Sequence, residues 1–189
     1  HIQMLLANEP SGHDWWHISR VYKTSIAIAE HYPEADCKVI QLAALLHDIA
    51  DWKSHNGDFS IGPTKAKEWL SGFHDITPEQ IEHITHIIKN ISFKGINAGV
   101  VALSLEGQIV QDADRLDAIG AVGIARTFAY GGSRGNIMHN PEIAPLEFTD
   151  EASYVFNKRV STTINHFYEK LLLLKDLLNT EYGRKLAES

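Results

Sequence analysis

The stretch VIQLAALLHD, residues Val39–Asp48, is apolar at seven of its first eight positions and then ends in a histidine and an aspartate. A helix that is hydrophobic on nearly all sides belongs in a protein core. Burying an unpaired imidazole and a carboxylate at its end costs on the order of several kcal/mol. A metal ion is one partner that removes this cost, so the stretch predicts a buried helix that carries His47 and Asp48 to an ion.

The spacing of apolar residues is helical along nearly the whole chain, and almost no segment alternates like a β-strand. One helix start is explicit, because Thr77 is an expected N-cap with Pro78 first in the helix and Gln80 at the capping-box position. We predict an all-α, single-domain helical bundle spanning residues 1–189. The expected helices are 13–32, 34–52, 62–73, 77–91, a bent or split segment over 104–130, and a closing helix over 149–178.

Residues 131–148, GGSRGNIMHNPEIAPLEF, interrupt this pattern with three glycines and two prolines. A long segment without a helical period inside a compact domain is often functional. We therefore predict a lid or rim loop over the site, with Arg134 and His139 facing the substrate.

Composition limits the function. The 189 residues are 44% hydrophobic and 22% charged, with a net charge of −7, which disfavours binding to duplex nucleic acid. An acidic protein that handles an anionic substrate needs a local cation. Cys37 is the single cysteine, and there is no signal-peptide pattern or apolar run of about 18 residues. We expect a cytoplasmic protein without a membrane partner, in which LLLLKDLL, residues 171–178, packs in the core or forms a homodimer seam.

Metal-type side chains gather at four places: His17, then His47 with Asp48, then His83 and His86, and finally the aspartates of QDADRLDAIG. Imidazole and carboxylate ligands together suit Mn, Fe, Zn, Ni or Co. The residues alone leave two choices open, His13 or His17 and Asp112 or Asp114. The remaining aspartate of the last group, Asp117, is expected on a solvated helix face beside Arg115.

Four runs, GHDWWHISRV, AALLHDIADWK, ISFKG and QDADRLDAIGAVGIARTF, resemble the HD-domain superfamily of metal-dependent phosphohydrolases. The resemblance covers roughly residues 12–167 and is strongest to a small bacterial branch that is similar to nucleoside triphosphate pyrophosphohydrolases. It implies one divalent ion, Mn or another transition metal with Mg as an alternative. The implied ligands are His17, His47, Asp48 and Asp114.

Further roles are assigned around this centre. Asp51 lies one helical turn after His47 and is predicted to orient water or accept its proton, since a metal lowers the pKa of bound water towards about 7. Lys94 and Arg20 are the other predicted catalytic residues. Predicted substrate-binding residues are Lys53, His83, His86, Arg115 and Arg134.

The predicted reaction is metal-dependent hydrolysis of a small phosphorylated molecule, and the resemblance implies a (deoxy)nucleoside triphosphate cleaved to monophosphate and pyrophosphate. Phosphomonoesterase and cyclic-nucleotide phosphodiesterase activities remain alternatives, because a fold does not fix a function. A non-catalytic nucleotide- or metal-binding module is a third. A two-iron oxygenase, with His83 and His86 as additional ligands, is a fourth.

Overall fold

The computed structural model describes residues 2–6, 13–50, 58–93, 101–147 and 161–188. All regular secondary structure in these ranges is helical, which confirms the predicted all-α class. The elements are α1 (Ile2–Leu5), α2 (Trp15–Ala29), α3 (Cys37–Leu46), α4 (Ile61–Leu70), α5 (Pro78–Asn90), α6 (Leu105–Asp117), α7 (Gly120–Ser133), α9 (Asn165–Glu169), the 3-10 turns η2 (Leu171–Leu173) and η3 (Lys175–Leu177), and α10 (Glu181–Leu186).

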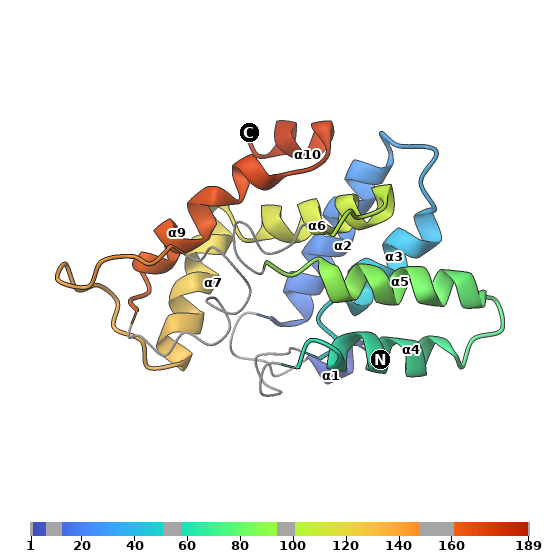
Figure 1. Ribbon diagram of the computed structural model, residues 1–189, viewed down its shortest axis with the longest axis horizontal. Coiled ribbons are helices and arrows are strands. Elements are labelled where there is room, and N and C mark those ends of the chain that lie inside the picture. The colour runs from blue at the N-terminus through green and yellow to red at the C-terminus, as the bar shows by residue number, and fades with distance from the viewer. Residues whose placement is uncertain (1, 7–12, 51–57, 94–100, 148–160, 189) are drawn as a thin grey trace.

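Helix α2 is central to the bundle, because it packs against both α3 and α6 (Figure 1). Helix α5 covers α3 and pairs with α4. Fully buried side chains such as Ile18, Ile40 and Ile109 join α2, α3 and α6 into one core. The ends of these three helices are therefore held in fixed positions relative to one another.

Helix starts follow local signals in the sequence. The Thr77 hydroxyl oxygen accepts a hydrogen bond from the Gln80 backbone amide, and the Gln80 side-chain oxygen accepts one from the Thr77 backbone amide. The predicted capping box is therefore confirmed, with Pro78 in the first turn. The side chains of Asp36 and Ser104 also cap α3 and α6, by accepting hydrogen bonds from backbone amides of the first turn. These caps satisfy amide groups that no helical partner can reach.

The segment predicted as bent or split over 104–130 is two helices. Helix α6 ends at Asp117 and α7 begins at Gly120, whose φ of +77° favours glycine. A Cβ at Gly123 would lie 2.3 Å from the Ala118 carbonyl oxygen, so glycine lets α7 fold back closely against the end of α6.

The closing helix predicted over 149–178 is wrong in its described part, since residues 161–178 form α9 and two 3-10 turns instead. The backbone leaves the helical region at Lys170 and becomes extended at Leu178, with ψ at 139°. This break brings Asn179 and Thr180 to the buried carboxylate of Asp112, which accepts hydrogen bonds from both. Residues 149–160 lie outside the described ranges.

The glycine- and proline-rich segment packs against α9 through its backbone. The carbonyl groups of Ile137 and Met138 accept from Thr163 and Ile164, and Asn165 donates to the Ile143 carbonyl. These contacts anchor residues 137–143, and the lid remains a prediction. Across the described ranges, none of the helices combines the length and apolarity that crossing a bilayer requires.

Candidate metal centre

Four polar side chains converge where α2 begins, α3 ends and α6 ends. His17 lies in the first turn of α2, His47 and Asp48 follow α3 directly, and Asp114 lies in the last turn of α6. The two imidazole Nε2 atoms are 3.2 Å apart. An Asp48 oxygen lies 3.4 Å and 3.6 Å from them, and an Asp114 oxygen lies 3.5 Å and 3.8 Å from them. The structure thus brings together all four side chains that the family resemblance implies as ligands.

These separations fit a single ion. Nitrogen and oxygen ligands lie about 2.0–2.2 Å from zinc, and a tetrahedron with such bonds has edges of about 3.3–3.6 Å. Two imidazoles with two carboxylates are a donor set that first-row transition metals accept. Two overlapping groups among the described residues could hold a metal, His17 with His47 and Asp114, and His17 with His13 and Asp48.

Both histidines direct Nε2 towards the shared space. Nδ1 of His47 lies 2.9 Å from the Ala44 carbonyl oxygen and Nδ1 of His17 lies 2.7 Å from Asp117. A carbonyl or carboxylate oxygen only accepts, so each Nδ1 carries a hydrogen and a neutral ring keeps its lone pair on Nε2.

Asp117 is buried rather than solvated, which corrects the expectation that it lies on a solvated face with Arg115. Its side chain is 6% exposed and accepts from His17, Arg20 and Arg126. Burial raises the pKa of Asp117, but its hydrogen bonds from His17 and Arg20 outweigh burial and hold the pKa well below its usual range. Its spacing of three residues from Asp114, which puts both on one face of α6, was the available signal.

The cluster attracts positive charge. Burial lowers the pKa of His17, yet hydrogen bonds to Asp117 and Asp48 with the nearby carboxylate charges raise it to about 9. Burial raises the pKa of Asp48, but the charges of His47 and His13 hold it well below the usual value. The carboxylates that stabilise a charged imidazole here would also stabilise a divalent cation.

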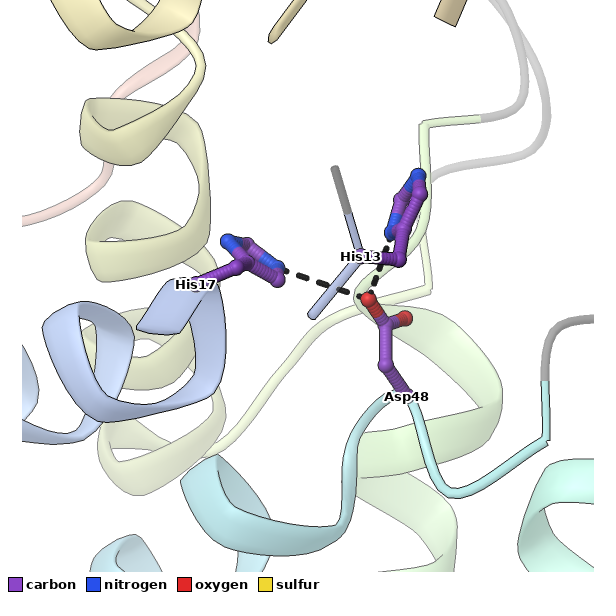
Figure 2. Close-up of side chains that lie close together, drawn as sticks. All are labelled: His13, His17 and Asp48. Carbon is purple, nitrogen blue, oxygen red and sulfur yellow. Dashed lines mark hydrogen bonds and ion pairs between the residues drawn. The ribbon is translucent and has the colours of Figure 1, made fainter. Parts of the chain in front are cut away.

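His13 occupies the outer side of Asp48. Its Nδ1 lies 2.7 Å from the Asp48 oxygen that also faces His17, as Figure 2 shows. Its ring meets Tyr130 edge-on at 6.4 Å between centroids, and the Arg134 guanidinium lies 5.3 Å from the centre of the Tyr130 ring. The end of α7, with Arg134, therefore borders the site. His13 and His17 both approach Asp48, but His17 also reaches His47 and Asp114.

Asp112 and Arg115 form hydrogen bonds with the C-terminal segment rather than with the metal-type cluster. Asp112 is fully buried and accepts from Asn179 and Thr180. Arg115 donates to the carbonyl of Leu177. Both side chains hold the C-terminal segment, so Asp114 is the aspartate that faces the cluster. Arg20, predicted as catalytic, pairs with Asp117.

The two histidines of α5 do not join the centre. His83 Nε2 lies 2.7 Å from the Ser104 hydroxyl and 3.6 Å from Glu106, at the start of α6. Glu106 and Asp114 are eight residues apart, or about 12 Å along a helix axis. His86 is exposed and belongs to no metal-type group among the described residues. The structure gives the two-iron oxygenase no additional histidine ligands from α5.

Three predicted site residues, Asp51, Lys53 and Lys94, lie outside the described ranges, and their roles stay predictions. A groove of about 380 Å³ lies beside the centre between α2 and α7. It is lined by Asp14, Arg20, Ala121, Val122, Ala125 and Arg126. The sequence reasoning missed Arg126, because only the packing of α7 brings it to Asp117.

A model of the HD domain family matches residues 15–119, the range that supplies all four converging side chains. The chain therefore belongs to the HD-domain family of metal-dependent phosphohydrolases. It is 38% identical to Bacillus subtilis YpgQ over 190 residues, covering 99% of this chain and 82% of YpgQ.

Solved structures of related proteins are similar to this chain over nearly its whole length. A crystal structure from Lactobacillus plantarum is 37% identical with a TM-score of 0.86, covering 99% of this chain and 84% of that one. An HD-superfamily hydrolase from Bacillus thuringiensis is 42% identical with a TM-score of 0.68, covering 99% and 83%. YpgQ has been crystallised in complex with ADP, at 34% identity, a TM-score of 0.69 and coverage of 99% and 86%.

Proposed function

We propose that the protein hydrolyses a (deoxy)nucleoside triphosphate to the monophosphate and pyrophosphate, with one divalent ion held by His17, His47, Asp48 and Asp114. The observation that carries this proposal is that the two Nε2 atoms lie 3.2 Å apart and that an oxygen of each of the two carboxylates lies 3.4–3.8 Å from both of them. The complex of YpgQ with ADP supports a nucleotide as the substrate class.

When bound, the ion supplies hydroxide at neutral pH and offsets the charge of the phosphoryl oxygens. The protein's own residues hold and orient the reactants. Asp51, four residues after His47 in the sequence, accepts a proton from the attacking water. Lys94 and Lys53 neutralise the phosphate chain, so that pyrophosphate leaves readily.

The rim formed by His13, Tyr130 and Arg134 suits the outer part of the substrate. Arg134 is exposed, at the end of α7, and lies over the Tyr130 ring. A guanidinium group in this position reaches phosphate oxygens with paired hydrogen bonds. The segment 131–148 would then cover the bound nucleotide.

The test is a panel of nucleoside and deoxynucleoside triphosphates with metal-stripped protein and added Mn²⁺, Mg²⁺, Co²⁺ or Ni²⁺. We expect monophosphate and pyrophosphate in equal amounts, abolished by a chelator. In ¹⁸O-labelled water, attack at the α-phosphorus places the label on the monophosphate. Label on orthophosphate or pyrophosphate would reject this reaction. Absence of turnover with every metal would favour the binding module.

Matched variants make the assay specific. Asp114→Asn removes a proposed ligand and should abolish turnover. Asp75→Asn makes the same change at an exposed carboxylate that pairs with Lys38, and should leave turnover unchanged. Asp51→Asn should slow turnover greatly while the metal stays bound.

A further inference from the structure

We infer that Asp117 is a positioning residue, which fixes the hydrogen of His17 on Nδ1 and so presents Nε2 to the metal, and that Arg20 and Arg126 clamp Asp117 in place. The inference rests on the metal centre of the proposed function, but not on its substrate or reaction.

The contact between Asp117 and His17 is short and shielded from water. His17 is 0% exposed, and its Nδ1 lies 2.7 Å from Asp117 Oδ2. Ionised carboxylates accept hydrogen bonds and cannot donate them, so Nδ1 must be the donor. Metal-binding histidines are commonly oriented by such a carboxylate, which also makes the ring a stronger ligand.

Two arginines from different helices hold the carboxylate. Arg20 of α2 donates from Nε to Oδ1 at 2.5 Å and from a terminal nitrogen to Oδ2 at 3.1 Å. Arg126 of α7 donates to Oδ2 at 2.6 Å. Rotation of the Asp117 side chain would break these contacts together, so its oxygen stays aimed at His17.

The two histidines of the centre are oriented by different means. His47 donates to the carbonyl of Ala44 in its own helix, so its orientation comes with the end of α3. His17 depends on a side chain one hundred residues away in the sequence, and on an arginine of α7. Helix α7 thereby takes part in forming the metal centre without supplying a ligand.

Asp117→Asn is the direct test, because the asparagine side chain has nearly the same shape as aspartate but is a weaker hydrogen-bond acceptor. Its NH₂ group would also face the donors of His17, Arg20 and Arg126. The Kd for Mn²⁺, measured from the free-ion signal in electron paramagnetic resonance, should rise about 10–100-fold. Arg126→Gln leaves the carboxylate but loosens its clamp, and should raise the Kd less. Asp75→Asn should leave the Kd unchanged.

A second measurement separates positioning from a loss of fold. In Zn²⁺-loaded protein with ¹⁵N-labelled histidine, the Nδ1 proton of His17 should resonate far downfield because of its short hydrogen bond. That signal should move upfield in Asp117→Asn while the helical signal is kept. An Asp117→Asn variant that binds Mn²⁺ within twofold of the wild type, or an unmoved proton resonance, would overturn the inference.

The outcomes also separate this inference from the proposed reaction. A wild type that binds Mn²⁺ but hydrolyses no nucleotide would reject the reaction alone, and the change in Kd would still support the role of Asp117. A wild type that binds no divalent ion would reject both.

Discussion

Asp112 and Asp114 stand two residues apart in α6, and the structure predicts opposite consequences for their loss. Asp112 is 0% exposed and accepts five hydrogen bonds, from the backbone and side-chain groups of Asn179 and Thr180. Asp114 faces His17 and His47 instead. Replacing each by alanine therefore tests which aspartate supports the fold and which supports the metal.

The cost of Asp112→Ala follows from the donors it would abandon. The Thr180 amide and hydroxyl are buried, and the Asn179 amide is partly so. Leaving a buried donor unsatisfied costs about 1–3 kcal/mol, and the contacts of one carboxylate are not additive. We expect a loss of about 3–5 kcal/mol, which lowers the Tm by roughly 6–20 °C for a chain of this size.

Chemical denaturation of metal-free protein, followed by circular dichroism, measures the loss. Asp112→Ala should unfold at lower denaturant while the folded protein still binds one equivalent of Mn²⁺. Asp114→Ala should lower the midpoint much less than Asp112→Ala, because the Asp114 side chain is 32% exposed and accepts no hydrogen bond from a backbone donor of the described residues, and it should bind no Mn²⁺. A loss under 1 kcal/mol for Asp112→Ala, or the reverse assignment of metal loss, would refute the argument.

Three other substitutions test separate parts of the structure. His47→Ala should abolish Mn²⁺ binding in equilibrium dialysis while helicity survives, and a full bound equivalent would contradict the site. Asp36→Ala should cost about 0.5–2 kcal/mol at neutral pH, because it removes the cap of α3. Burial raises the pKa of Asp36 but its hydrogen bonds lower it further, so the folded pKa lies below the unfolded one. That contribution is present above about pH 4 and fades as the pH falls, so denaturation midpoints of variant and wild type should converge in acid. Gly131→Ala should destabilise by about 1–3 kcal/mol, since its Cβ would lie 2.2 Å from the Thr163 hydroxyl oxygen. Gly132→Ala should not, because beyond its own helix backbone its Cβ would meet none of the described residues within 4 Å; equal melting temperatures of the two variants would contradict this.

The convergence of His17, His47, Asp48 and Asp114 could be predicted because their signals are local or ordered along the chain. The apolar run and the polar pair at its end, His47 and Asp48, lie within ten residues, so the cost of burying them can be recognised from this stretch alone. Likewise, Thr77 and Gln80 form their capping box within one helical turn. Such features depend on chain neighbours, so tertiary packing does not change them.

The burial of Asp117 and the broken closing helix could not be predicted in this way. Asp117 is buried because α7 folds back and brings Arg126 to it, and nothing in QDADRLDAIG records that contact. Residues 161–178 have a helical apolar period, yet the backbone becomes extended at Leu178. This extended backbone places Asn179 where its backbone and side-chain amides donate to the buried carboxylate of Asp112. In both cases a tertiary hydrogen bond outweighs the local pattern.

The charges around the centre explain how an acidic chain can work on a phosphate ester. Asp48, Asp114 and Asp117 carry three negative charges against the two positive charges of Arg20 and Arg126. A histidine ligates a metal only as a neutral ring, so His17 releases a proton when the ion binds. The side chains of the set then carry one net negative charge, and the divalent ion converts it to one net positive charge. The field that raises the pKa of His17 to about 9 is thus the field that binds the ion. In a protein of net charge −7, attraction of a polyanionic substrate would then depend on the bound metal, so metal removal should abolish substrate binding as well as turnover.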